Sequence, residues 1–376
     1  MQKCILHYVS LAQFKTLNVI WSYNKVINTV PTVSLKFSKQ GILTEISTKL
    51  STEQPSTDEQ VVVCNPKIKP GIESNIFTED ISKVTSQNMQ GIKEAILLAH
   101  KQREELATDL ETIKRDLKQY QDKLRWSYIL LYGLIIRSIR RELQDSIINQ
   151  KLAISALENY ILHSTVALNV SFENQIKLSF DGMFDSFRQL CKSDKIWDLT
   201  ASYKVDRFTT RSSANNEVYR TEVSFMTGHL KQITSDIQAM IFQNANGADL
   251  YLYPNFVVLW NHLEEFAIIG FDEIDIEVRT TRFIEDGTVP NDSKTVDRTW
   301  AKVNKNGSPD LRFKNNYQIP IVEYGEISIN TKTGLNEKYQ FSSVPLAEAF
   351  VKAFVEYQIQ VIRLDYVPSV GNNINL

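Results

Sequence analysis

The longest regular pattern in this chain is IKEAILLAHKQREELATDLETIKRDLKQYQDKL, residues 92–124. Spacings of four and three alternate along it, and the seam positions are Ile92, Ile96, Ala99, Arg103, Leu106, Leu110, Ile113, Leu117, Tyr120 and Leu124. This spacing is typical of a helix that buries one stripe against another helix. Such a helix spans ~50 Å at ~1.5 Å per residue, so its stripe needs a partner.

A second series follows the apolar segment WSYILLYGLII, residues 126–136. Its members are Ile139, Leu143, Ile147, Gln150, Ile154, Leu157 and Ile161. Extending the first series would place Arg141, Asp145 and Ser155 in the seam, so the phase changes near Gly133. We therefore predict two helical arms around an apolar tip at residues 126–136. The arms pair with each other or with a second copy.

Composition places the chain among globular proteins. Its 376 residues are 43% hydrophobic and 23% charged, which is ordinary for a protein with a core. The 42 basic and 44 acidic side chains give a formal charge of −2, so a nucleic-acid partner is not expected. Cys4, Cys64 and Cys191 are widely separated, which disfavours a disulfide framework and a CxxC metal site. Residues 1–30 make a poor signal peptide, so we expect a cytoplasmic protein.

The first part of the chain carries strand and linker signals. Val33, Leu35 and Phe37 alternate with polar residues and predict a strand, and residues 42–46 predict a second strand after a turn at Gln40-Gly41. We assign residues 1–50 to a small β-rich segment.

Residues 51–77 are rich in Ser, Thr, Gln, Asp and Pro, which is typical of a linker. The helical hairpin is assigned to residues 78–162. Thr78 is a candidate N-cap for its first helix, and Thr85 is nearly as good a candidate.

Residues 163–361 predict a mixed, mainly antiparallel β domain, followed by a tail at residues 362–376. The predicted strands are residues 166–172, 176–180, 195–203, 256–260, 266–269, 274–278, 317–322 and 325–330. Residues 183–191 predict a short helix, and residues 287–309 a long irregular loop. Asn246-Gly247 predicts a type I′ hairpin turn.

A last helix is predicted from Ser343, with Pro345 in its first turn. A curved antiparallel sheet closed by a C-terminal helix is the order of elements in pleckstrin-homology-like domains. The predicted fold class is therefore α+β, with a coiled-coil hairpin stalk joined to this β domain.

Histidines and glycine motifs offer little catalytic chemistry. His7, His100, His163, His229 and His262 have no HxxxH spacing and no neighbouring cysteine, so structural or surface roles are favoured over a zinc site. The chain lacks Gly-x-Ser-x-Gly, Gly-x-x-x-x-Gly-Lys and Gly-x-Gly-x-x-Gly. We assign no catalytic residue, no metal ligand and no cofactor.

Four acids cluster in FDEIDIEV, residues 271–278. On a strand, Glu273, Asp275 and Glu277 share one face and could hold Mg²⁺, as in metal-dependent nucleases. No nearby lysine completes an Asp...Glu-x-Lys set, and a solvated strand face explains the same residues. A hydrolase or nuclease with this acidic site remains an alternative function.

Two groups of residues are candidate contact surfaces. Arg207, Arg211 and Arg220 surround Ser212 and Ser213 and are candidate anion contacts, although solvation of a loop is the simpler explanation. The apolar segment offers five side chains for membrane or partner contact: Trp126, Tyr128, Leu131, Tyr132 and Ile135.

The apolar segment is too short to cross a bilayer, because as a helix it reaches ~16 Å against a core of ~30 Å. Cations flank it at Lys123, Arg125, Arg137, Arg140 and Arg141. They match a segment that dips into an anionic leaflet, which would make the protein peripheral to the inner membrane. Packing on its own domain or on another protomer is the simpler explanation of so short a segment.

Five motifs between about Lys195 and Tyr357 are shared with a known group of proteins. They are WDLT (197–200), RSSA (211–214), FQNANGADLYLYP (242–254), KVNKNGSPD (302–310) and GLNE (334–337). They resemble the C-terminal region of bacterial proteins with a domain of unknown function, which open with a glycine-rich β segment and a helical stalk. VSLKFSKQG (33–41) is similar to a strand of that segment, but the glycine-rich continuation is missing. The resemblance implies a bacterial protein and brings no activity with it.

These patterns predict a non-catalytic interaction or scaffold protein of the bacterial cytoplasm. It would assemble into an oligomer through its stalk and bind a protein partner through its β domain. The alternatives are a peripheral membrane protein and the hydrolase or nuclease described above.

Overall fold

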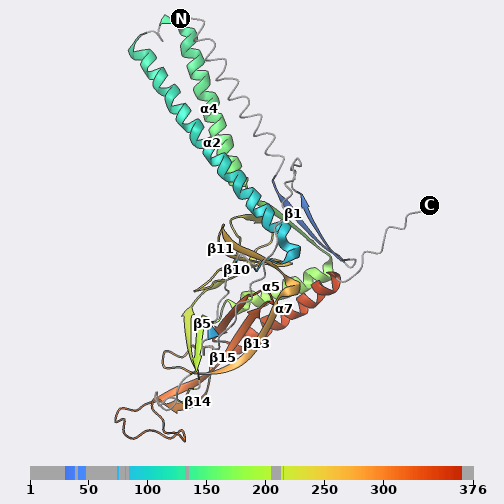
Figure 1. Cartoon of the computed structure of the whole chain (residues 1–376), viewed down its shortest axis with the longest axis vertical. Coiled ribbons are helices and arrows are strands. Elements are labelled where there is room, and N and C mark those ends of the chain that lie inside the picture. The colour runs from blue at the N-terminus through green and yellow to red at the C-terminus, as the bar shows by residue number, and fades with distance from the viewer. Residues whose placement is uncertain are drawn as a thin grey trace, which may run out of the picture.

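The computed structural model describes residues 30–38, 41–47, 74–75, 81, 84–131, 135–204, 213–214 and 216–365. This part of the chain is a mixed α+β fold with three sheets and four α-helices. Two of the helices project from a β-rich body and make the molecule elongated (Figure 1).

Helices α2 (Gln90–Ile129) and α4 (Arg137–His163) form the projection, which we call the stalk (Figure 1). They run antiparallel and bury a cluster between them: Leu106, Ile113, Ala153 and Leu157. Lys114 Nζ lies 2.8 Å from Glu158 Oε1 and links the two helices. The helices predicted from the two apolar series are thus present, and they lie beside each other within one chain.

The root of the stalk belongs to the main core. Ile92, Ile96 and Ala99 of α2 are buried in the same cluster as the strands of the body. Thr85 does not cap this helix, because α2 begins at Gln90 after a 3-10 turn, η3 (Gln87–Met89). The Thr85 hydroxyl instead accepts a hydrogen bond from Lys93 Nζ at 3.2 Å. Thr78 lies outside the described residues.

A four-stranded sheet joins the N-terminal segment to the strand that follows the stalk. Its order is β2 (Gly41–Ser47), β1 (Thr32–Ser38), β4 (Val166–Phe172) and β8 (Ile233–Ser235). Strand β1 is antiparallel to β2 and parallel to β4. Val33, Leu35 and Phe37 are buried as their alternation predicts. The two N-terminal strands therefore form part of the body.

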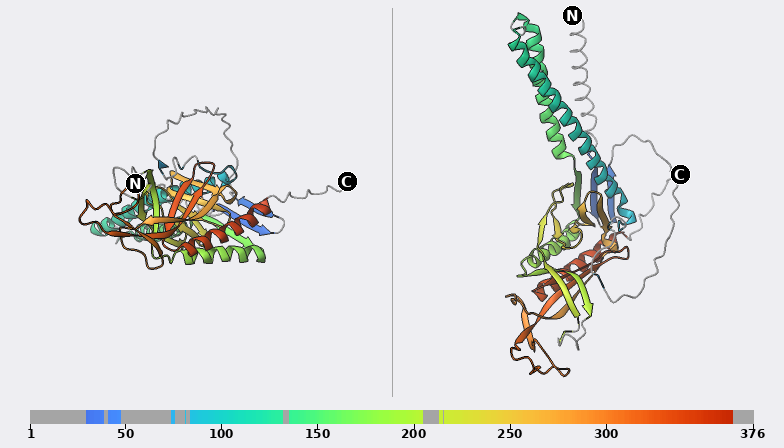
Figure 2. Two further views of the ribbon diagram at one scale, coloured as in Figure 1. Left: turned by 90° about the horizontal axis from the view of Figure 1, so that it is seen from below. Right: turned by 60° about the vertical axis from the view of Figure 1, so that its left-hand side comes forward.

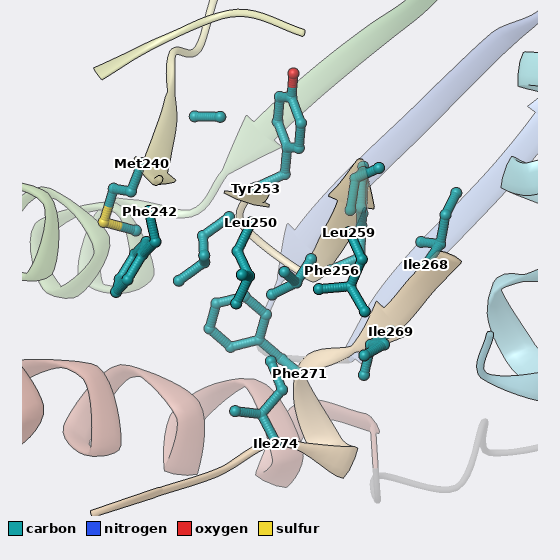
Figure 3. Packing of buried hydrophobic residues seen from close by; sticks show 14 of the residues in the cluster. Met240, Phe242, Leu250, Tyr253, Phe256, Leu259, Ile268, Ile269, Phe271 and Ile274 are labelled. Atoms are coloured by element: carbon teal, nitrogen blue, oxygen red, sulfur yellow. The ribbon is translucent and has the colours of Figure 1, made fainter. Parts of the chain in front are cut away.

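A five-stranded antiparallel sheet holds much of the core. Its order is β12 (Glu265–Gly270), β11 (Phe256–His262), β10 (Asp249–Leu252), β9 (Ala239–Phe242) and β7 (Phe225–Gly228). Figure 3 shows Phe242, Leu250 and Phe271 packed among its apolar side chains.

A seven-stranded sheet follows the order β13 (Asp275–Ile284), β15 (Gln318–Asn330), β16 (Asn336–Phe341), β5 (Ile196–Lys204) and β3 (Ser74–Asn75). Strand β14 (Lys294–Trp300) also pairs with β15, and β6 (Asn216–Glu222) pairs with β5. Ser213 Oγ and Thr299 Oγ1 lie 2.9 Å apart, so the segment before β6 meets β14. The sheet is thereby curled over one of its faces.

Helices α5 (Asn174–Leu190) and α7 (Val344–Asp365) pack on each other and cover the sheets (Figure 1). Phe350 of α7 contacts Phe187 of α5 with tilted rings whose centroids lie 5.6 Å apart. The Tyr357 hydroxyl donates to the Pro254 carbonyl oxygen at 2.8 Å. The terminal helix predicted from Ser343 is thus confirmed as α7.

Two predicted strand assignments are wrong. Residues 176–180 belong to α5, whose buried side chains Ile176, Phe180, Met183, Phe187 and Leu190 recur at helical spacing. The predicted strands at residues 317–322 and 325–330 are one continuous strand, β15.

The predicted irregular loop also needs correction. Residues 287–309 contain strand β14, whose side chains are mostly exposed and so leave no alternating pattern. Strand β13 pairs with β15, in a different sheet from β12.

The hairpin of β9 and β10 is present, but its predicted type I′ turn is wrong. Leu250 lies opposite Phe242, so residues 243–248 connect the strands. Among described residues positive φ occurs at Gly41, Gly307, Gly334 and Leu131, and not at Asn246 or Gly247. Backbone N–H groups of this loop instead donate to side-chain carboxylates, which set its shape.

Candidate functional site

The stalk tip, residues 126–136, exposes large apolar side chains at the end farthest from the body (Figure 2). The exposed fraction is 56% for Trp126, 64% for Leu130, 58% for Leu131 and 81% for Ile135. Tyr128, Ile129 and Ile136 are also exposed, while Tyr132 lies outside the described residues. No described part of the body covers this surface, so packing on the protein's own domain is not what the structure shows.

The exposed tip side chains point in several directions around the helix. Successive residues of an α-helix are rotated by ~100°, so Trp126 and Ile129 share one face while Tyr128 lies on nearly the opposite side from Trp126. Within the described part of the tip only Ser127 is buried, and its hydroxyl donates to the Leu124 carbonyl oxygen at 2.7 Å. The tip is therefore an apolar end and not a one-sided stripe.

Helix α2 ends in an unusual backbone conformation at the tip. Leu131 has φ of 63°, in the left-handed region that usually takes glycine. An L-residue with a bulky side chain is strained there by ~1–2 kcal/mol. Strain of this kind persists where the surrounding structure or function requires it.

Cations surround the apolar tip. Lys123, Arg125, Arg137 and Arg141 are exposed and Arg140 is half-buried. The acids in the same stretch are Asp122 and Glu142, so the five cations face two acids. The cations that flank the apolar segment in the sequence are thus exposed or half-buried beside the tip, and we call these five residues the collar.

The curled sheet of the body encloses a polar groove with a volume of about 780 Å³. Strands β5, β6, β13, β14, β15 and β16 contribute to its lining. Hydroxyl and amide side chains such as Thr281, Thr299 and Gln340 lie beside charged ones. Arg279 is paired with Glu326 on its wall. The lining of the groove therefore combines polar and charged side chains with apolar ones such as Leu199 and Ile321.

Arg220, a predicted anion contact, is already engaged inside the body. Its Nη1 donates to Gln340 Oε1 at 2.8 Å, and its Nη2 lies 2.5 Å from Glu285 Oε2. The guanidinium carbon lies 4.0 Å from the ring centroids of both Trp197 and Phe283. Because Glu285 is its anionic partner, Arg220 has a structural role inside the body. Arg207 and Arg211 lie outside the described residues.

The acidic segment does not form a metal site in the described residues. Asp275 and Glu277 lie exposed on β13 while Ile274 and Ile276 are buried, as the alternation predicts. Asp272 and Glu273 lie in a 3-10 turn, η4 (Phe271–Glu273). Across the described ranges, no group of three or more His, Cys, Asp or Glu side chains is arranged to hold a metal ion.

Asp198, which no sequence pattern assigned to a site, is fully buried on β5. Its Oδ2 accepts the Ala245 N–H at 2.8 Å, while Oδ1 has no hydrogen-bond partner among the described residues. Burial raises the pKa of Asp198 to about 6, and the Ala245 N–H partly offsets this rise. An acid inside the apolar run Ile196–Leu199 was the signal that could have identified it.

Comparisons with known proteins do not indicate a role for the tip or the groove. None of the family models, curated proteins or solved structures matches the chain. Among the described residues, the helices are all too short or too polar to cross a membrane.

Proposed function

We propose that this chain is a non-catalytic interaction protein, in which the stalk presents an apolar docking tip and the body holds a second partner in its polar groove. The exposed tip is the observation that carries this proposal. Contiguous exposed apolar surface is costly in water and usually marks a site of association. A tip held far from its own body is accessible to a large partner surface.

The stalk acts in this proposal as a coiled-coil spacer. Its support is the buried cluster of Leu106, Ile113, Ala153 and Leu157, whose members lie on both helices. Gln150 is also buried on α4, and a buried polar residue in a seam favours one pairing over others. A spacer of this kind keeps the two docking surfaces apart.

The body is proposed to resemble a pleckstrin-homology-like domain and the bacterial domain of unknown function. Two motif segments meet at Asp198, which supports the second likeness. Tyr339, just after the GLNE motif, lies opposite Asp198 of WDLT in the strand register. Ala245 of the long FQNANGAD motif donates to the same aspartate.

A comparison of substituted chains tests the docking role of the tip. The tip variant carries Trp126→Gln, Leu130→Gln and Ile135→Gln. The matched control carries Ile148→Gln, Leu152→Gln and Leu162→Gln, because these α4 residues are similarly exposed at 55%, 65% and 73%. Each protein is immobilised, and the proteins and lipids that it retains from a bacterial lysate are measured.

We expect the tip variant to lose most retained material and the control to match the wild type. Equal retention by all three proteins would overturn the docking role. The nuclease alternative is tested separately, by assaying Mg²⁺- or Mn²⁺-dependent cleavage of nucleic acid. Cleavage that is lost in Asp275→Ala/Glu277→Ala would replace the non-catalytic proposal with an enzymatic one.

A further inference from the structure

We infer that the stalk tip inserts end-on into the surface of an anionic lipid bilayer. This inference rests on the proposed docking role of the tip and names its partner. Trp126 and Tyr128 would lie at the level of the headgroups, with the arginines of the collar on lipid phosphates.

The distribution of apolar side chains favours lipid over protein. A protein groove receives one face of a helix, so its ligand carries a stripe of apolar residues at spacings of three and four. Trp126 and Ile129 share one face, but the exposed Tyr128 lies on nearly the opposite side from Trp126, and Leu131 and Ile135 extend the exposed surface beyond the helix end. A fluid apolar layer solvates such an end on all sides.

The length of the apolar segment sets the depth of insertion. Its reach of ~16 Å as a straight helix falls well short of the ~30 Å bilayer core. The chain also turns back within this segment, since α2 ends at Ile129 and α4 begins at Arg137. The tip therefore reaches the headgroup and upper acyl region, which amphipathic segments enter by ~5–10 Å.

The side chains around the tip match the layers of a membrane surface. Tryptophan and tyrosine favour the interface, where the ring is buried and its polar atom is hydrated. Arg137 and Arg141 follow the apolar segment and are exposed, so they can reach phosphates from the stalk side. Each cation near an anionic surface strengthens binding about fivefold.

Leu131 supplies an independent observation at the tip. Glycine would relieve its left-handed backbone at φ of 63°, yet the chain places an exposed leucine there. Leu131 strains the backbone and exposes an apolar side chain to water, so it does not stabilise the free protein. Insertion into lipid gives this side chain an apolar environment, and the strain is then offset by binding.

Vesicle flotation of the full chain tests the inference. Vesicles of phosphatidylcholine alone are compared with vesicles containing phosphatidylglycerol, at low and high salt. We expect the chain to float with the anionic vesicles and to be released by salt. Arg137→Gln/Arg140→Gln/Arg141→Gln should bind about 100-fold more weakly. Lys101→Gln/Lys118→Gln, on the stalk away from the tip, should bind as the wild type does.

Leu131→Gly separates docking from folding. The change should leave the unfolding midpoint unchanged or raise it, because the backbone strain is relieved. It should also weaken vesicle binding about tenfold, because an inserted leucine is lost. A variant that gains stability and keeps full vesicle binding would overturn the insertion of Leu131.

The depth of tip insertion is measured by quenching of tryptophan fluorescence with lipids brominated on their acyl chains. The chain contains Trp21, Trp126, Trp197, Trp260 and Trp300, so each measurement is repeated with Trp126→Phe. We expect quenching in the wild type that largely disappears in Trp126→Phe while that variant still floats. Flotation with equal quenching in both proteins would show that another segment inserts, and would overturn the inference.

The results also separate this inference from the proposed function. A wild type that does not float, but retains lysate protein through its tip, rejects the bilayer and keeps the docking role. Tip substitutions that lower the mass of the chain in solution without vesicles, with no flotation of the wild type, identify a second copy as the occupant. Loss of both properties rejects both proposals.

Discussion

Arg220 Nη2 lies 2.5 Å from Glu285 Oε2 inside the body, where the two side chains are only 14% and 7% exposed. Removing one partner of a buried ion pair leaves the other charge unpaired and costs ~3–5 kcal/mol. We expect Arg220→Ala to lower the free energy of unfolding by about this amount in urea titrations. Arg220→Lys should also destabilise the protein, because lysine cannot keep both the Gln340 hydrogen bond and the flat contact with the rings.

An exposed pair provides the control. Lys195 Nζ lies 2.6 Å from Glu222 Oε1, with side chains 40% and 58% exposed. Lys195→Ala should cost less than ~1 kcal/mol. Equal effects at Arg220 and Lys195 would show that the Arg220 pair does not hold the sheet together.

Asp198 should make stability depend on pH. Its folded pKa of about 6 lies above the ordinary aspartate pKa of 3.8, so the folded state binds more protons between these values. Stability contributed by this group is therefore gained as pH falls through about 6, and the penalty for the charged form is present above it. Asp198→Asn removes that penalty. We expect the free energy of unfolding of the variant to exceed that of the wild type by ~1–2 kcal/mol at pH 8. This difference should disappear near pH 4.

The unfolding free energies of both proteins are measured in urea from pH 4 to 8. Burial, together with Glu337, Asp198 and Asp249, raises the pKa of Tyr339, and both proteins keep Glu337 and Asp249. A difference that is constant across this range would show that Asp198 titrates as an ordinary aspartate.

Two leucines on α4 distinguish the inner face of the stalk from its outer face. Leu157 is 1% exposed and Leu152 is 65% exposed. Leu157→Asp places a charge between the helices and should cost several kcal/mol, with loss of helical circular dichroism on mild heating. Leu152→Asp should change the melting curve little. Identical curves for the two variants would reject the packing of α4 on α2.

Glycine substitutions test the corrected hairpin. Gly334 has φ of 121°, so Gly334→Ala should destabilise the protein by ~1–2 kcal/mol. Gly247 is not in the left-handed region, and Gly247→Ala should change stability by less than ~1 kcal/mol. Thermal melting compares the two. A larger loss at Gly247 would restore the type I′ turn expected from the sequence.

The helices were the most predictable elements because their apolar residues repeat over many turns. Helix α5 has the same apolar repeat. Residues 176–180 were nevertheless predicted as a short strand, because they were considered apart from Met183 and Phe187. At Gly325 a glycine looked like a break between strands. It is needed because a Cβ there would lie 2.7 Å from Ala347 Cβ of α7, a contact that sequence cannot show.

The candidate sites were predictable to different degrees. The tip was found because its apolar residues and cations are adjacent in sequence. The groove was not, because its lining comes from strands that meet only after the sheet curls. The partners of Arg220 could not be predicted for the same reason, since Glu285 is distant in sequence.

The parallel pairing of β1 with β4 has a consequence for the order of folding. Thr32 lies opposite Ala167, so the whole stalk separates two neighbouring strands along the chain. Closing a long loop is slow, whereas adjacent helices can zip together through local contacts. Once α2 and α4 have paired, the ends of the two helices next to the body are close in space. Strands β1 and β4 then have only a short distance to close. The stalk then acts as a folding nucleus for the sheet, and Leu157→Asp should slow the refolding of the body more than it speeds its unfolding.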